Sequence, residues 1–154
     1  MNHVTLENSA PGMISENCFI PLSGQLDTTG LAINYYERLP GENIGFCYHR
    51  HLEQEEVFVV LSGTATFETE DGDIEVGQNE MIRFAPGEWQ QGSNRGDQPV
   101  SLIAIGAPRD EGATELRRDC PDCGIRRDVT PEEANGTLVY HCTSCGAETG
   151  REFY

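Results

Sequence analysis

The sequence contains no lysine. All ten of its basic residues are arginine, against 26 aspartates and glutamates, and the formal net charge is −16. A dense carboxylate surface without lysine is typical of proteins that work in very high salt, where repulsion between charges is screened within a few ångströms and carboxylates keep the protein hydrated. An ordinary acidic protein would explain the charge but not the missing lysine, so we expect a halophilic source.

Long apolar runs are also absent. No stretch approaches the roughly 20 consecutive apolar residues that cross a bilayer. The first thirty residues lack the basic segment and the continuous apolar core of a secretory signal. These absences predict a soluble, cytoplasmic protein with no membrane contact. The 154 residues suffice for one ordinary domain with a small appendage, but not for two full domains.

Helical periodicity is missing from most of the chain, and short strand-like runs separated by turns take its place. These runs cover residues 31–39, 44–51, 57–61, 64–69, 74–76, 81–84, 89–91 and 100–105. Strands this short and regularly spaced predict an all-β sandwich or barrel. Asp71-Gly72 is the clearest hairpin turn.

Composition divides the chain into four segments. Residues 1–30 are mostly turn-forming and are expected to be an N-terminal arm that supplies one strand to a neighbour, whereas residues 31–107 hold all the strand-like runs. Residues 108–118 are polar, without alternation, and are predicted to be a linker. Residues 119–154 are predicted to be a separate unit. The charge changes close to this boundary: residues 1–116 contain 19 acids and five arginines, whereas residues 117–154 contain seven acids and five arginines.

Two histidines and a glutamate form a candidate metal site. His49 and His51 are two residues apart, so on an extended strand both side chains point to one face. Glu56 is expected to reach that face from an adjacent strand after a short turn. Two imidazoles and one carboxylate hold a divalent metal and leave positions open for substrate or O₂. The same alternation turns Cys47 toward the pocket, as a core thiol, and Arg50 to the opposite face.

The pattern His49-x-His51-x4-Glu56-x6-Gly63 resembles the first conserved motif of the cupin superfamily. The spacing fits throughout. One departure is Asn43, which stands where that motif has a glycine six positions before the first histidine.

Residues 85–94 resemble the second cupin motif. Gly87 and Asn94 match it, Ala85 replaces a proline, and Gln90 replaces the third metal-binding histidine. A glutamine offers a neutral carboxamide oxygen, which is a harder and weaker donor than imidazole and favours Mn²⁺ or Fe²⁺. The alternative is that Gln90 turns out of the coordination shell and hydrogen-bonds a ligand.

The resemblance, in particular to cupin-domain proteins of halophilic archaea, implies a double-stranded β-helix or jelly-roll barrel over residues 31–107. It also implies a homodimer and a divalent metal (Fe, Mn or Zn) held by His49, His51, Glu56 and Gln90. An enzyme of this kind would act on a small polar metabolite, with dioxygenase and isomerase as the leading classes. The alternative is a non-catalytic module that binds or senses a small molecule and contacts a partner.

Four cysteines form a second candidate metal site. Cys120-x2-Cys123 and Cys142-x2-Cys145 are eighteen residues apart, and a glycine follows each pair. This spacing predicts a structural zinc site whose four thiolates leave no open position for catalysis. The segment resembles a zinc ribbon. A unit of fewer than forty residues has too little core to fold unaided, so the metal is expected to supply most of its stability.

Arginines in this unit and at the end of the preceding linker are a candidate basic patch, namely Arg117, Arg118, Arg126 and Arg127. The unit is nevertheless weakly acidic, and high salt suppresses phosphate contacts because it opposes counterion release. Nucleic acid is therefore the least favoured partner. A contact with another protein, or a lid over the barrel, is the favoured role.

Overall fold

The computed structural model describes residues 1–6 and 18–153. The elements whose bounds lie within these residues are one short helix and thirteen strands. Their bounds are β1 Cys18–Pro21, α2 Ser23–Leu26, β2 Ala32–Arg38, β3 Asn43–His51, β4 Glu55–Ser62, β5 Thr64–Thr69, β6 Gly72–Gly77, β7 Met81–Phe84, β8 Gln90–Ser93, β9 Val100–Ala107, β10 Thr114–Asp119, β11 Arg126–Ala134, β12 Thr137–Cys142 and β13 Glu148–Phe153. Among these described residues, no helix is long and apolar enough to span a bilayer.

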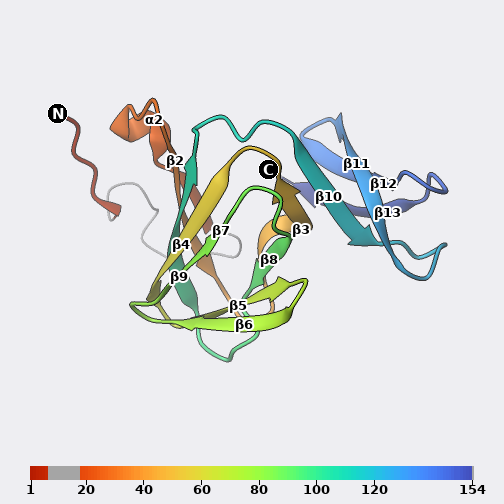
Figure 1. Cartoon of the computed structure of the whole chain (residues 1–154), viewed down its shortest axis with the longest axis horizontal. Coiled ribbons are helices and arrows are strands. Elements are labelled where there is room, and N and C mark those ends of the chain that lie inside the picture. Colours follow the sequence, from red (N-terminus) through yellow and green to blue (C-terminus); the bar gives the residue numbers. More distant parts are fainter. Residues whose placement is uncertain (7–17, 154) are drawn as a thin grey trace.

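The strands form two antiparallel sheets, which confirms the predicted all-β class (Figure 1). The smaller sheet has the strand order β1-β2-β9-β4-β7, and the larger one has the order β13-β12-β11-β10-β3-β8-β5-β6. The hairpin predicted at Asp71-Gly72 joins β5 to β6, with Thr69 paired to Gly72. Gly72 has a φ of 113°, a left-handed value that favours glycine.

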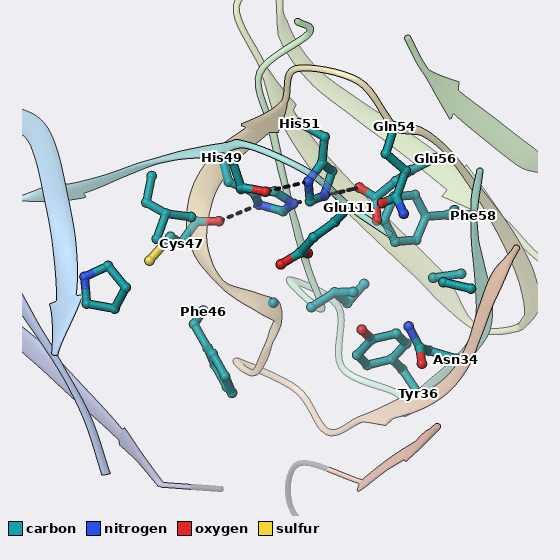
Figure 2. A pocket seen from close by; sticks show the side chains of 18 of the residues that line it. Asn34, Tyr36, Phe46, Cys47, His49, His51, Gln54, Glu56, Phe58 and Glu111 are labelled. Atoms are coloured by element: carbon teal, nitrogen blue, oxygen red, sulfur yellow. Dashed lines mark hydrogen bonds and ion pairs between the residues drawn. The ribbon is translucent and has the colours of Figure 1, made fainter. Parts of the chain in front are cut away.

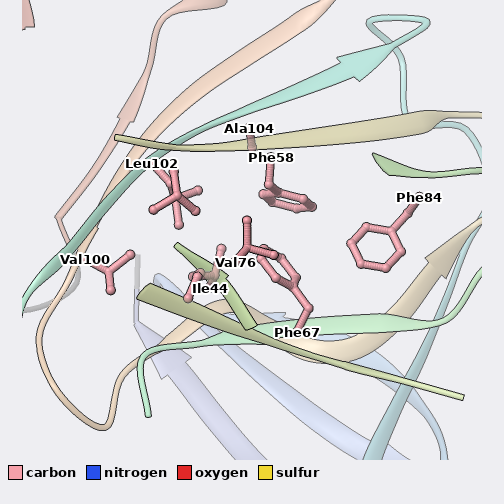
Figure 3. Close-up of a cluster of buried hydrophobic side chains, with 10 residues drawn as sticks. Ile44, Phe58, Phe67, Val76, Phe84, Val100, Leu102 and Ala104 are labelled. Atoms are coloured by element: carbon pink, nitrogen blue, oxygen red, sulfur yellow. The ribbon is translucent and has the colours of Figure 1, made fainter. Parts of the chain in front are cut away.

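The main hydrophobic core lies between the two sheets of the barrel (Figure 3). Phe58 and Leu102 from the smaller sheet face Phe67 from the larger one, and Phe84 closes one side. The Phe67 ring lies 4.9 Å from the Phe58 ring and 5.6 Å from the Phe84 ring, centroid to centroid. Because Phe67 and Leu102 have no exposed surface, this cluster fixes the spacing between the sheets.

The segment predicted to be a linker, residues 108–118, is partly a strand. Its last residues belong to β10, which pairs with β3 on one edge and β11 on the other. The sequence of this segment is polar because charged side chains of β10 form ion pairs with other strands. Glu115 pairs with Arg50, and Arg117 pairs with Asp128. The C-terminal unit therefore continues the larger sheet of the barrel, as the blue strands of Figure 1 show.

The predicted N-terminal arm also contributes a strand to the smaller sheet. Strand β1 pairs with β2, and Cys18, Ile20 and Leu22 are buried against Tyr35. Arg38 is buried at this corner, where its guanidinium donates to the carbonyl oxygens of Cys18, Glu37 and Asn43. The part of the arm in residues 7–17 lies outside the described residues.

We expect Phe67→Ala to lower the free energy of unfolding by about 3–5 kcal/mol, because it leaves a cavity at the centre of the core. Met81→Ala is the matched control, since Met81 is 66% exposed and its replacement should change stability by less than about 0.5 kcal/mol. Urea unfolding followed by circular dichroism measures both. Equal losses in the two variants would contradict this description of the core.

Candidate functional site

Strand β3 presents two imidazoles to the inside of the barrel. The Nδ1 atom of His49 lies 2.9 Å from the carbonyl oxygen of Cys47, and the Nδ1 atom of His51 lies 2.9 Å from the hydroxyl of Thr114. A carbonyl only accepts hydrogen bonds, so Nδ1 of His49 carries the proton. With both Nδ1 atoms held, the Nε2 atoms point to the interior. Support of this kind orients the ring of a metal-binding histidine.

Glu56 supplies the third candidate ligand from the opposite sheet. It was expected on a strand adjacent to β3, but β4 pairs with β7 and β9 and faces β3 across the barrel. Its Oε2 atom lies 3.4 Å from Nε2 of His51 and 3.7 Å from Nε2 of His49. Ligands about 2.1 Å from one ion lie about 3.0–3.4 Å apart. The three atoms therefore fit a divalent metal after a small contraction.

The charges of this cluster support one another. Burial raises the pKa of Glu56, but the two imidazoles outweigh burial and hold the pKa at about 2. Burial lowers the pKa of His49, but its contacts with Glu56 and with the carbonyl of Cys47 raise it above the usual value overall. The carboxylate is thus ionised at every physiological pH, as a metal ligand must be.

Gln90 closes the cluster from β8. Its Nε2 atom lies 3.0 Å from Nε2 of His49 and 2.9 Å from Oε2 of Glu56, to which it donates. The side chain is 2% exposed, and within the described residues its Oε1 atom has no hydrogen-bond partner. An unpaired buried oxygen is costly. Rotation of the amide would turn this oxygen toward the ligand cluster.

A cavity of about 490 Å³ opens in front of the three ligand atoms (Figure 2). Asn34 and Tyr36 line its far wall, and the carboxylate of Glu111 points into it beside the two imidazoles. Burial raises the pKa of Tyr36 to about 12, and the charge of Glu56 adds to the effect, so the phenol stays protonated. The cavity therefore offers hydrogen-bond donors and acceptors together.

Sequence reasoning missed the residues that the loop between β9 and β10 brings to the cavity. Glu111 and Arg109 come from this loop, which had been predicted to be a linker. Buried Gln54 holds the start of the loop, because its Nε2 atom donates to the carbonyl oxygen of Pro108 at 2.7 Å. A side chain at Gly106 would collide with Gln54, 2.6 Å from its Cδ atom. No motif marks these positions.

Cys47 lines the cavity, but its thiol is directed away from the histidines, toward the C-terminal unit (Figure 2). It packs there against Val129 and Tyr140, both buried. The prediction of a core thiol fits this position. The prediction that Arg50 faces away from the histidines also holds, since its guanidinium lies over the Trp89 ring and pairs with Glu115.

The four predicted zinc ligands come together at the end of β10. The Sγ atoms of Cys120, Cys123, Cys142 and Cys145 all lie within 4.8 Å of one another, and those of Cys120 and Cys145 are 3.5 Å apart. Thiolates about 2.3 Å from one zinc ion are about 3.8 Å apart, so the cluster fits a tetrahedral ion. Burial raises the pKa of Cys142, but the amides of Cys145 and Ser144 lower it, to about 6.

Three arginines of the predicted basic patch join the C-terminal unit to the barrel. Arg126 forms a 2.7 Å ion pair with Glu68 and lies over the Tyr48 ring. Arg117 lies over Trp89, and Arg118 lies over Tyr140. The following ion pairs involve the same arginines: Arg117 with Asp128, and Arg118 with Glu152. These cations are therefore engaged within the molecule.

Comparison with protein families identifies the barrel. Residues 35–106 match the model of one family, described as the cupin domain. This segment has the fold that the resemblance implied, a double-stranded β-helix. No curated protein matches the sequence.

Solved structures share this cupin fold. An uncharacterized conserved protein with a double-stranded β-helix domain, from Klebsiella pneumoniae, is 17% identical, with a TM-score of 0.61 over 74% of this chain and 89% of that one. A sugar phosphate isomerase from a cupin superfamily, from Silicibacter pomeroyi, is 17% identical, with a TM-score of 0.56 over 92% and 77%. The cupin domain of an XRE family transcriptional regulator from Enterobacter cloacae is 17% identical, with a TM-score of 0.52 over 60% and 97%.

The Glu56 carboxylate should titrate at a pH of about 2 in protein whose barrel holds no metal, as measured by NMR on protein labelled at the glutamate side chains. A lowered pKa contributes stability that is present above the unfolded value, given as 4.5, and is lost as pH falls toward 2. A His49→Asn/His51→Asn variant loses both imidazoles but keeps the burial and the hydrogen bond from Gln90, so the pKa should rise well above 2. A wild-type value near 4.5 would contradict the described contacts.

Proposed function

We propose that this protein is a divalent-metal-dependent cupin enzyme that acts on a small polar metabolite. The observation that carries the proposal is the convergence of Nε2 of His49, Nε2 of His51 and Oε2 of Glu56 at one wall of a cavity that both polar and apolar residues line. Three ligands leave positions for a substrate. We assign these residues as metal ligands, with Mn²⁺ or Fe²⁺ favoured by the oxygen and amide groups around them.

Some residues of the cavity bind the substrate and others transfer protons. The metal, when bound, polarises a carbonyl or hydroxyl group of the substrate. Asn34 and the protonated Tyr36 bind polar groups of the substrate from the opposite wall. Arg109 lines the cavity and donates to the carbonyl oxygen of Thr28, so it also fixes the loop that bears Glu111.

Isomerisation is the reaction class that we favour over oxygenation. Glu111 is a carboxylate beside the ligand cluster that is not itself one of the three ligands. We infer that it takes a proton from the hydroxyl-bearing carbon next to the polarised carbonyl and returns it to the carbonyl carbon. The hydroxyl proton passes to the carbonyl oxygen, so the carbonyl and hydroxyl groups exchange places without a co-reactant. The sugar phosphate isomerase from Silicibacter pomeroyi, similar in fold, supports this choice.

A binding or sensing module is the second candidate, and Gln90 is the observation that favours it. Its amide donates to both His49 and Glu56, so metal binding must displace a hydrogen bond from His49. A pocket held by these bonds alone would bind a polar ligand without turning it over. The similar domain of an XRE family transcriptional regulator supports this alternative.

Glu56→Gln and Glu111→Gln should separate the two roles. We expect Glu56→Gln to abolish the barrel metal, because it removes the only anionic ligand of the three. Glu111→Gln should keep the metal and lower kcat by about a hundredfold or more, the usual contribution of a proton-transfer group. Metal content per chain, and turnover of sugars, sugar phosphates and hydroxy acids, measure these effects.

Glu75→Gln is the control for both variants, since Glu75 is an exposed residue of β6. It should match the wild-type protein in metal content and rate. Wild-type protein that gains no second metal in the presence of Mn²⁺ or Fe²⁺ would contradict the enzyme proposal, and ligand binding without turnover would then support the sensing module.

Gln90→His should tighten the affinity of the barrel for divalent metal by about tenfold or more, because an imidazole replaces an amide that now donates to the other ligands. Gln91→His is the matched control: it lies on the same strand but lines a different pocket, on the outer side. Calorimetric titration with Mn²⁺ measures both affinities. Equal affinity in Gln90→His and wild type would show that this position lies outside the coordination shell.

A further inference from the structure

The C-terminal unit forms one wall of the ligand cavity. Leu116 of β10, Pro131 of β11 and Tyr140 of β12 line the cavity together with residues of the barrel. Tyr140 is 3% exposed, so its ring is packed in a fixed position. The four-cysteine unit is thus more than an appendage on a complete barrel. Without it the cavity would be open on this side.

The contact between this unit and the barrel is a small shared core. Buried Cys47, Val129 and Tyr140 form it, with Leu116 and Leu138 packed around them. Cys47 belongs to β3, and its carbonyl oxygen holds Nδ1 of His49. The residue that orients one candidate metal ligand therefore also packs against β11 and β12.

A second connection runs along β10. Thr114 pairs with His51 in the sheet, and its hydroxyl holds Nδ1 of the same histidine at 2.9 Å. The strand ends at Asp119, and Cys120, the first of the four cysteines, follows directly. Strand β10 thus joins the support of one metal site to a ligand of the other through six residues of regular strand.

Besides these contacts and those of Arg117 and Arg126 with the barrel, the unit has little core of its own to hold this arrangement. Its strands β11 and β12 bury Val129, Val139, Tyr140 and Cys142, which is too little core for independent folding. Cross-linking by a metal at the four thiolates would supply that stability. Loss of the cross-link would release Tyr140 from the cavity wall and β10 from β3.

We propose that the metal of the four-cysteine cluster positions the barrel site, so that its occupancy sets the affinity of the cavity for metal and ligand. The claim that the four-cysteine metal sets the affinity of the barrel rests on the proposed function. The claim that this metal holds the C-terminal unit against the cavity rests only on the contacts of Cys47 and Tyr140. A cell short of zinc would then hold this protein in a state that binds its ligand weakly.

Alkylation of Cys47 in the full chain tests whether zinc holds the C-terminal unit against the barrel. Under reducing conditions, initial rates of modification are compared by peptide mass spectrometry in protein with one zinc per chain and in zinc-free protein. Cys47 should react at least about tenfold faster without zinc, because Val129 and Tyr140 no longer cover it. Cys18 is the internal control, since it is also buried but packs in the cluster of β1. An unchanged rate at Cys47, or equal acceleration at Cys18, would overturn the proposal.

Binding of Mn²⁺ to the same samples tests whether zinc in the four-cysteine cluster changes the affinity of the barrel for metal. This hard cation prefers oxygen and imidazole to thiolates, so it reports on the barrel. The zinc-loaded protein should bind Mn²⁺ about ten times more tightly than the zinc-free protein, and equal affinities would overturn the coupling. No binding in either sample would instead overturn the proposed function, while the rate at Cys47 would still decide whether the unit forms the wall.

Thr114→Val keeps all four cysteines and removes only the hydroxyl that holds His51. We expect Mn²⁺ affinity to fall about tenfold or more, the usual effect of losing such support, with no change in the rate at Cys47. Thr114→Ser restores the hydroxyl and should restore the affinity. Unchanged Mn²⁺ affinity in Thr114→Val would overturn the connection through β10.

Discussion

Strand β3 is the element on which the barrel site depends, because both of its edges are hydrogen-bonded to strands that bring further residues to the histidines. One edge pairs with β8, which brings Gln90 opposite His49, and the other pairs with β10, which brings Thr114 opposite His51. Its inner face carries the two imidazoles and its carbonyl at Cys47 holds one of them. Displacement of this strand would therefore disturb ligands, supports and the shared core together.

The contacts of His49, His51, Glu56 and Gln90 would differ between a metal-free and a metal-bound barrel. Without metal, the glutamine amide and the imidazoles satisfy the carboxylate, and one amide oxygen stays buried without a partner among the described residues. With metal, the three ligand atoms would bind the ion and the amide would turn or shift. The unpaired oxygen makes the first arrangement less favourable than its other contacts suggest.

Arginine side chains connect the barrel of this acidic chain to its C-terminal unit. The guanidinium groups of Arg126 and Arg117 lie over the rings of Tyr48 and Trp89, which are stacked 5.3 Å apart. The same arginines pair with Glu68 and Asp128. A guanidinium can stack and form an ion pair at once, which the ammonium of lysine does less well. Surface ion pairs contribute little singly, but stacking on a rigid aromatic pair fixes their geometry.

The sequence alone determined the features that depend on local spacing. The alternation of side chains in residues 64–69 and 81–84 predicted strands with the bounds of β5 and β7. His-x-His, and the paired C-x2-C motifs, predicted groups that the fold brings within 4.8 Å.

Only the tertiary structure decided which residues surround these groups. Glu111 and Thr114 come from a polar stretch without a motif, and they reach the histidines because β10 pairs with a strand some sixty residues earlier. The sequence of β10 led to the prediction of a linker because its charged residues find their ion-pair partners, Arg50 and Asp128, on other strands. Pairing of strands far apart in sequence leaves no periodic signal, and the position of Glu56 on the opposite sheet depends on it as well.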